Sequence, residues 1–263
     1  MTPRATTDWD AKSYDRLAAP QEAWAKGLLE GLALAGDEIV IDAGCGSGRV
    51  TKLLLERLPR GRVIGVDGSP SMIETAGEAF ARDDRVTLIC SDLLELTPQL
   101  VAERAGVEAV DVVFSNATFH WVADHELLFQ RLHRVLRPGG RLVAQCGGTG
   151  NVEAWLQAVR TAAAQEPWAE YLDGFEPWHF HGPEETERLL AAAGFTEVKC
   201  DLIEVEPITP EDPREFIAVV GLASHHERLP EELRERFTDA VIAALPQPFE
   251  LRYVRLNIDA RRA

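Results

Sequence analysis

Apolar runs alternate with amphipathic stretches along the first part of the chain. Between the runs, leucines and valines recur at helical spacing, as at Val50, Leu54 and Leu58 and again across residues 124–136. Strands that alternate with helices in this way predict an α/β fold with a doubly wound parallel sheet. Five short apolar runs are the predicted strands: residues 39–41, 62–66, 85–90, 109–114 and 141–146.

The pattern changes after the fifth run. Residues 151–182 are rich in aromatic side chains, and residues 212–245 hold helical patterns near 213–222 and 230–244. Ligand pockets are lined mainly by apolar and aromatic side chains, so we expect both stretches to be helical caps over a pocket. The remaining elements complete a mostly parallel seven-stranded sheet: a helix over 183–193 and strands over 197–205 and 250–258.

Composition places the chain among soluble globular proteins. It has 263 residues, 46% of them hydrophobic, and a formal net charge of -16. A surplus of negative charge opposes binding to nucleic acids and anionic membranes, so we expect neither as a partner. The first ten residues lack the apolar core of a signal peptide, and no apolar run has the length of a membrane helix. These features predict a cytoplasmic protein, and nothing in them indicates an oligomeric state.

Cysteines and histidines show no spacing typical of a metal site. Cys45, Cys90, Cys146 and Cys200 occur singly, and we expect them to be buried free thiols of a cytosolic protein. The histidines at 179, 181, 225 and 226 lack a third ligand at metal spacing, and the adjacent pair is expected at the surface. We therefore predict no metal.

The first predicted strand leads into a glycine-rich turn. Asp42 ends the strand, Gly44, Gly46 and Gly48 follow at every second position, and a helix begins near Arg49. Glycine allows positive φ and a close approach of backbone to ligand, while the helix N-terminus attracts negative charge. A dinucleotide loop would place a third glycine at Arg49. A carboxylate beside the turn suits a ligand that carries an ammonium or sulfonium.

Acidic residues also follow the second and third strands. Asp67 ends the second strand 23 residues after Gly44, near the offset of an acid that binds ribose hydroxyls. Asp92 lies just after the third strand. Because ligands bind at the carboxyl ends of strands in open α/β sheets, three acids at three such ends predict one nucleotide-type pocket.

These motifs resemble those of class I S-adenosylmethionine-dependent methyltransferases. The resemblance covers about residues 37–146 and rests on D-x-G-x-G-x-G, on Asp67-x-Ser69-Pro70-x-Met72, on Ser91-Asp92-Leu93 and on L-R-P-G-G-R-L. It implies that S-adenosyl-L-methionine is the cofactor and S-adenosyl-L-homocysteine the product, with Asp92 accepting from the adenine amino group. The implied cofactor-binding residues are Asp42, Gly44, Gly46, Gly48, Asp67, Gly68, Met72, Ser91, Asp92, Leu93 and Asn116.

A narrower resemblance concerns the acceptor. Trp9-Asp10 with Tyr14, the Ser-Asn-Ala-x-x-His-Trp stretch at 115–121 and the terminal Ala-Arg-Arg resemble the trans-aconitate 2-methyltransferase and malonyl-carrier-protein O-methyltransferase group. That group has glutamine where this chain has His120. Both families methylate carboxylates, so the resemblance implies a small-molecule carboxylic acid converted to its methyl ester.

The candidate catalytic residues are His120 and Tyr14. A carboxylate is already ionised at pH 7 and needs no base, so His120 is either a base for a hydroxyl or amine, or a hydrogen-bond donor that orients the acceptor. Tyr14 is placed to close over the donor from the N-terminal arm. For the acceptor, Trp121 is a candidate contact, and the candidate carboxylate clamps are Arg16, Arg252 and Arg255.

Other functions stay open. The tryptophans of 151–182 favour O-, N- or C-methylation of an aromatic or polyketide-like metabolite, with His120 as base. An NAD-dependent dehydrogenase is opposed by Arg49, Asp42 and Asp92. A module that holds S-adenosylmethionine without chemistry is the non-enzyme alternative.

We expect three parts in the chain. Residues 1–36 form an N-terminal arm and a helix (21–34) over the active site, residues 37–146 form the S-adenosylmethionine-binding core, and residues 147–263 add the rest of the sheet with the caps at about 151–182 and 212–245.

Overall fold

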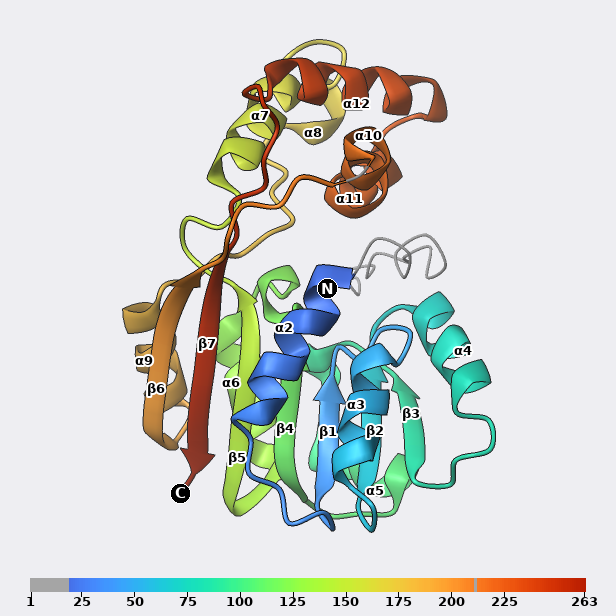
Figure 1. Cartoon of the computed structure of the whole chain (residues 1–263), viewed down its shortest axis with the longest axis vertical. Coiled ribbons are helices and arrows are strands. Elements are labelled where there is room, and N and C mark those ends of the chain that lie inside the picture. The colour runs from blue at the N-terminus through green and yellow to red at the C-terminus, as the bar shows by residue number, and fades with distance from the viewer. Residues whose placement is uncertain (1–18, 211) are drawn as a thin grey trace.

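The fold is built on a central seven-stranded sheet (Figure 1). The computed structural model describes residues 19–210 and 212–263, with side chains from residue 24 onward. Tyr14 and Arg16, and the Trp9-Asp10 pair, therefore lie outside the described residues. The strands are β1 (Ile39–Ala43), β2 (Arg62–Asp67), β3 (Val86–Cys90), β4 (Val110–Asn116), β5 (Leu136–Gly147), β6 (Phe195–Glu204) and β7 (Val254–Arg262).

The strand order is β3-β2-β1-β4-β5-β7-β6. Strands β1 to β5 pair in parallel, and β7 runs antiparallel to both β5 and β6. The predicted doubly wound, mostly parallel seven-stranded sheet is confirmed. Its order reverses between β1 and β4, and such a switch point is where ligands bind in open α/β sheets.

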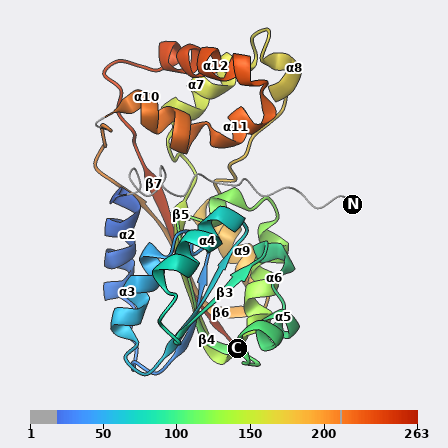
Figure 2. The ribbon, with the colours of Figure 1, turned by 90° about the vertical axis from the view of Figure 1, so that its right-hand side faces the viewer.

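Helices cover both faces of the sheet (Figure 2). One apolar cluster packs α2 and α3 on one face, and a larger one packs α5, α6 and α9 on the other. Side-chain caps start several helices: Ser69 accepts from the Met72 N–H and Asp124 from the Leu127 N–H. The helices are α2 (Ala19–Glu30), α3 (Arg49–Arg57), α4 (Pro70–Ala79), α5 (Pro98–Ala105), α6 (His125–Val135) and α9 (Pro183–Ala192), with short 3-10 turns η1 (Leu93–Glu95) and η2 (Phe119–Trp121).

A helical cap stands beyond the carboxyl ends of the parallel strands (Figure 1). It has its own apolar core, in which α7 packs on α12 through Trp155, Val159, Phe237 and Val241. The cap comprises α7 (Glu153–Ala163), α8 (Ala169–Leu172), α10 (Pro213–Phe216), the π-helical turn η3 (Ile217–Gly221), α11 (Ala223–Arg228) and α12 (Glu231–Ala244). Across the residues that the structure describes, each helix is too short or too polar to cross a bilayer.

The structure corrects several predicted boundaries. The first helix ends at Glu30 rather than 34, because the chain turns there: the Leu32 N–H donates to the Leu29 carbonyl three residues back, and Arg57 donates to the carbonyls of Leu29 and Leu32. The fifth strand begins at Leu136, because the Pro-Gly-Gly segment forms a bulge opposite β4 instead of a separate turn. The last strand begins at Val254 rather than 250.

Two predictions about burial were also wrong. Cys90 is exposed, because it ends β3 at the edge of the sheet. His225 is buried rather than at the surface, because α11 turns it into the core of the cap, against Phe175, Trp178 and Phe237.

Candidate active site

The glycine turn between β1 and α3 leaves open space at one position. All three glycines have positive φ, and the N–H groups of Gly44 and Cys45 donate to the Val66 carbonyl on β2. A Cβ on Gly44 would lie 2.1 Å from Thr118, and one on Gly48 would lie 2.4 Å from Phe80. At Gly46 the nearest atom is the sulfur of Met72 at 3.9 Å, so this is where a ligand can meet the backbone.

Asp67 stands directly behind that opening. Its carboxylate accepts the Gly46 N–H and the Ser69 N–H, both at 2.9 Å, and the Gly68 N–H also supports it. Burial raises the pKa of Asp67 above its ordinary value, against the lowering effect of these bonds. Because an ionised carboxylate has about four acceptor sites and these three N–H groups use three of them, Asp67 keeps capacity for a hydroxyl group of a ligand.

Asp42 supports the turn from inside. It is 1% exposed and accepts a 2.6 Å hydrogen bond from the Thr51 hydroxyl on α3. Burial raises the pKa of Asp42 to about 7. With so little surface, Asp42 is not accessible for direct contact with a ligand.

The remaining cofactor candidates continue along the same edge. Ser91 donates its N–H to the Asp67 carbonyl, and Asp92 accepts the Leu94 N–H and so caps η1. Leu93 is buried beside them, and Met72 is buried under the turn. The structure thus gathers the predicted residues at the ends of β1, β2 and β3.

The segment after β4 joins this edge to a second pocket. Ala117 has a φ of +58°, a conformation that costs a non-glycine residue roughly 1–2 kcal/mol. Its N–H donates to Gln145 at 2.7 Å, while the Thr118 hydroxyl lies 3.4 Å from the Gly44 carbonyl and 3.1 Å from that of Asn116. Asn116 is buried at the end of β4. One short turn therefore touches the glycine loop and leads into the neighbouring pocket.

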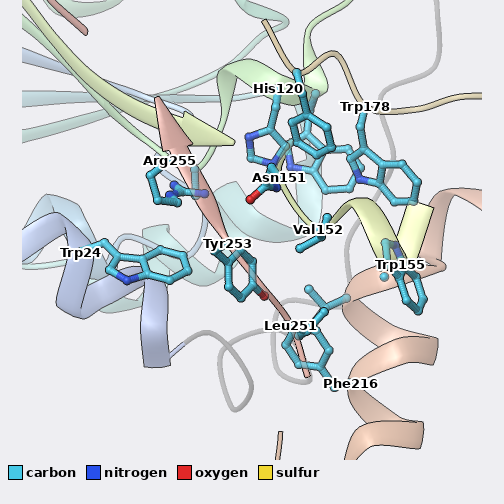
Figure 3. A pocket seen from close by; sticks show the side chains of 15 residues that line it. Trp24, His120, Asn151, Val152, Trp155, Trp178, Phe216, Leu251, Tyr253 and Arg255 are labelled. Atoms are coloured by element: carbon cyan, nitrogen blue, oxygen red, sulfur yellow. The ribbon is translucent and has the colours of Figure 1, made fainter. Parts of the chain in front are cut away.

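That pocket lies between the sheet and the cap (Figure 3). It encloses about 660 Å³, part of it open to solvent. Its walls come from α2, the segment after β4, both cap segments and the chain that enters β7. They are Trp24, Ala117, His120, Trp121, Asn151, Val152, Trp155, Trp178, Phe180, Phe216, Val220, Gly221, Leu251, Tyr253 and Arg255.

His120 is held by its backbone neighbour. Its Nδ1 accepts the N–H of Gly147 at 3.2 Å, and its ring stacks on Phe180 with centroids 5.6 Å apart. Burial lowers the pKa of His120 well below its ordinary value, and the nearby Arg255 guanidinium lowers it further. The ring is therefore neutral with its proton on Nε2, which makes Nε2 a hydrogen-bond donor.

Arg255 lies beside His120 (Figure 3). Its side chain is buried, with Cζ 4.5 Å from the centre of the Trp24 ring. Its Nε donates to Gln145, which donates to Asn257, which donates in turn to Asp201. This series across β5, β7 and β6 fixes the guanidinium at the pocket wall.

Of the two other described residues predicted to contact the acceptor, one lines the pocket and one does not. Trp121 lines the pocket, 6.0 Å from Trp178 between ring centroids. Arg252 does not, because its side chain is 74% exposed and pairs with Glu250. Sequence reasoning missed Trp24, whose only signal was its place on a helix expected over the site. Over the described ranges, no three His, Cys, Asp or Glu side chains gather as a metal site would require.

Comparisons with known proteins agree with this geometry. The methyltransferase domain family matches residues 41–144. Uncharacterised methyltransferase C70.08c of Schizosaccharomyces pombe is 30% identical over 223 residues, which cover 83% of this chain and 82% of that protein. The chain belongs to the class I S-adenosylmethionine-dependent methyltransferases.

Two further comparisons cover this chain to different extents. Trans-aconitate 2-methyltransferase of Acidovorax ebreus is 34% identical over 165 residues, 63% of this chain and 59% of that protein. The match thus spans about 59% of that relative's length. Phosphoethanolamine N-methyltransferase 2 of Haemonchus contortus, solved with phosphomonomethylethanolamine and S-adenosylhomocysteine, shares the fold with a TM-score of 0.60 at 20% identity, over 96% of this chain and 56% of that chain.

The cofactor of the methyltransferase is S-adenosyl-L-methionine. The glycine turn fits this group, because Gly46 faces open space and Asp67 behind it has an acceptor site to spare. When bound, the cofactor supplies a methyl group activated by the positive charge of its sulfonium.

Proposed function

We propose that the enzyme transfers the methyl group to a carboxylate oxygen of a small molecule and forms a methyl ester. The observation that carries this proposal is that Arg255 and His120 line the same pocket, next to the glycine turn. A guanidinium binds a carboxylate through two parallel hydrogen bonds, and a neutral imidazole N–H adds a third.

The residues that bind the methyl donor are assigned from their positions at the carboxyl ends of the strands. We propose that residues 37–146 hold the cofactor, with Asp67 accepting from the ribose hydroxyls and Asp92 from the adenine amino group. Gly44, Gly46 and Gly48 shape the backbone against the methionine part, and Asp42 acts on its charge through space. The four cysteines, all free thiols among the described residues, support a cytoplasmic location.

No base is required for this reaction. A carboxylate is ionised at pH 7, and its attack on a sulfonium methyl releases no proton. His120 is not arranged as a base, because its Nδ1 is occupied by the Gly147 N–H and its Nε2 carries the proton. The residues of the pocket contribute alignment, a term that can reach about 7–11 kcal/mol.

Methylation of an aromatic or polyketide-like metabolite is the second candidate. The four tryptophans of the lining favour it, since aromatic walls bind aromatic ligands well. A phenol or amine acceptor would have to lose a proton, and His120 would then act as base in its other tautomer.

The test uses S-adenosylmethionine labelled in its methyl group, a panel of carboxylic acids and a panel of phenols and amines. We expect label that mild base releases as volatile methanol, as a methyl ester requires. Label that survives base would overturn carboxylate methylation and make His120 the leading base. Enzyme denatured by heat is the control for non-enzymatic transfer.

A further inference from the structure

We propose that the acceptor is a monocarboxylate with a flat apolar body, rather than a di- or tricarboxylate. This inference rests on the proposed function and narrows it to a substrate class. Three properties of the pocket support it: the charges on its walls, the shape of its apolar side and the end that faces the donor.

The walls offer positive charge for one carboxylate. Among the lining residues that the structure describes, Arg255 alone carries positive charge, and none is an aspartate or glutamate. Together with the Nε2–H of His120 it satisfies the two oxygens of a single carboxylate. Against the described part of the lining, a second or third carboxylate would meet Trp155, Phe216 or Leu251, where a charge without a partner is strongly disfavoured.

The rest of the lining is shaped for rings. Tyr253 meets the Trp24 ring edge-on at 5.0 Å, and Trp121 lies against Trp178. Trp155 is fixed from behind, because a Cβ on Gly221 would lie 2.5 Å from its ring. Broad, rigid aromatic surfaces favour offset or edge-on contact with a planar apolar body.

The two ends of the pocket differ in polarity, and this difference sets the orientation of the acceptor. Ala117 and His120 follow β4, on the turn whose Thr118 touches the Gly44 carbonyl, so the polar end is next to the donor. Trp155 and Phe216 belong to α7 and α10 and form the far end (Figure 3). The carboxylate therefore faces the methyl group while the body extends toward the cap.

The reaction is balanced without another reactant. A lone pair of the carboxylate oxygen forms the new O–CH₃ bond as the S–CH₃ bond breaks, and the bonding electrons stay on sulfur. The products are a neutral methyl ester and the thioether S-adenosylhomocysteine.

The first test compares acids with the full chain and methyl-labelled cofactor. The apolar monocarboxylates are cinnamate, indole-3-acetate, 2-naphthoate and decanoate, and trans-aconitate and fumarate are the polycarboxylates. We expect kcat/KM for at least one apolar acid to exceed that for either polycarboxylate by 100-fold, with base-labile label. A polycarboxylate that matches or surpasses every apolar acid overturns the substrate class and leaves carboxylate methylation standing. Base-stable label overturns the proposed function itself.

Binding supplies a second readout. With S-adenosylhomocysteine present, apolar monocarboxylates should quench the tryptophan fluorescence of the pocket with submillimolar Kd, and the corresponding amides should bind at least tenfold more weakly. Failure of all four apolar acids to bind overturns the inference.

Two variants test the contacts to the carboxylate and to the apolar part of the acceptor separately. Arg255→Gln should raise KM for the best apolar acid at least 50-fold, whereas Arg252→Gln, an exposed arginine on the same segment, should leave it unchanged. Trp178→Leu should weaken the aromatic acids tenfold and leave the small acid crotonate unaffected. Retained S-adenosylhomocysteine binding and circular dichroism show that each variant is folded. Equal effects of Arg255→Gln and Arg252→Gln contradict the inference.

Discussion

The proton of one imidazole separates two mechanisms at the residue scale. The Gly147 N–H occupies Nδ1 of His120, so the neutral ring, which lines the pocket, carries its proton on Nε2. Burial and the adjacent Arg255 hold the pKa of His120 far below neutrality, so no titration of this ring is expected in the working range. A donor of this kind orients an acceptor and cannot accept its proton.

His120→Gln tests this assignment. Because a glutamine amide also donates, we expect kcat/KM for an acid acceptor to fall by less than about tenfold, the size of one neutral hydrogen bond. The wild-type rate should show no limb from this ring between pH 6.5 and 9. A loss of several orders of magnitude, with S-adenosylhomocysteine affinity intact, would instead identify His120 as the base.

Asp67→Asn tests the donor side. The exchange keeps the shape but removes a charged acceptor, worth about 1.5–3 kcal/mol, so affinity for S-adenosylhomocysteine should fall roughly 10- to 100-fold. Isothermal titration calorimetry measures it. Asp83→Asn is the control, because that carboxylate pairs with Arg85 away from the glycine turn. Equal affinity of the Asp67 variant and the wild type would refute the assignment.

At the scale of elements, the glycine turn has positions of different kinds. Gly44 and Gly48 are closed by Thr118 and Phe80, so their lack of a side chain serves packing, whereas Gly46 faces open space that a ligand can enter. Within residues 44–48, glycine therefore allows close packing at two positions and leaves open space at the third.

Gly46→Ala and Gly44→Ala should have opposite consequences. Gly46→Ala should fold with a loss of about 1–2 kcal/mol from its positive φ, yet bind S-adenosylhomocysteine much more weakly. Gly44→Ala should lower the melting temperature strongly, because its Cβ would overlap Thr118. Thermal melts without ligand and calorimetry with it distinguish the two. Normal ligand binding by Gly46→Ala would contradict this division.

The cap contains an acid-sensitive residue. Burial lowers the pKa of His225 to about 3, and its Nδ1 has no hydrogen-bond partner among the described residues. A lowered folded-state pKa means that its stability contribution is present above about pH 6.5 and is lost as pH falls toward 3.

Asp42 on β1 has the opposite effect on the pH dependence of stability. Its folded-state pKa is raised to about 7, so its contribution to stability is lost as pH rises from about 4 to 7.

His225→Phe isolates the first of these effects. At pH 5 the protonation of unfolded His225 disfavours the native state by about 2 kcal/mol, and phenylalanine removes that penalty. Calorimetric melts at pH 8 and pH 5 should therefore show a smaller acid loss for the variant than for the wild type. An identical loss would mean that this histidine is not protonated on unfolding.

The sequence predicted the elements whose boundaries are local. The strands before Asp67 and after Arg85 follow from apolar runs, and the cap of α4 follows from Ser69-Pro70. The features that the sequence analysis missed depend on contacts between residues that are distant in the sequence. Leu251 forms an isolated bridge with Ile208 and so stays outside β7, and the carbonyls of Leu29 and Leu32 at the end of α2 accept from Arg57 on α3. Trp24 joins the pocket through contacts with Tyr253 and Arg255, which lie more than two hundred residues away in the sequence.

At the scale of the whole molecule, net charge sets how the two substrates arrive. The chain carries 43 acidic and 27 basic side chains, and its formal charge of -16 repels an anionic acceptor and attracts the cationic methyl donor. An anionic acceptor would meet this repulsion before it reached the buried Arg255.

Salt should therefore act on the two substrates in opposite directions. Raising NaCl from 20 to 200 mM shortens the screening length to less than about 10 Å, so KM for an acid acceptor should fall a few-fold while KM for S-adenosylmethionine rises. Initial rates at pH 8 test this, with sucrose as an uncharged control. A shift of both constants in the same direction would refute the role of net charge.

The cap also bears on how such an enzyme diversifies. Both of its segments leave the sheet after β5 and after β6, and the family match at residues 41–144 ends before either begins. Of the lining residues, only Ala117, His120 and Trp121 lie inside that match. Most of the described pocket lining therefore lies outside the matched methyltransferase domain. A chimera that received residues 148–182 and 205–253 from a relative would exchange most of the acceptor site and keep the machinery for the methyl donor.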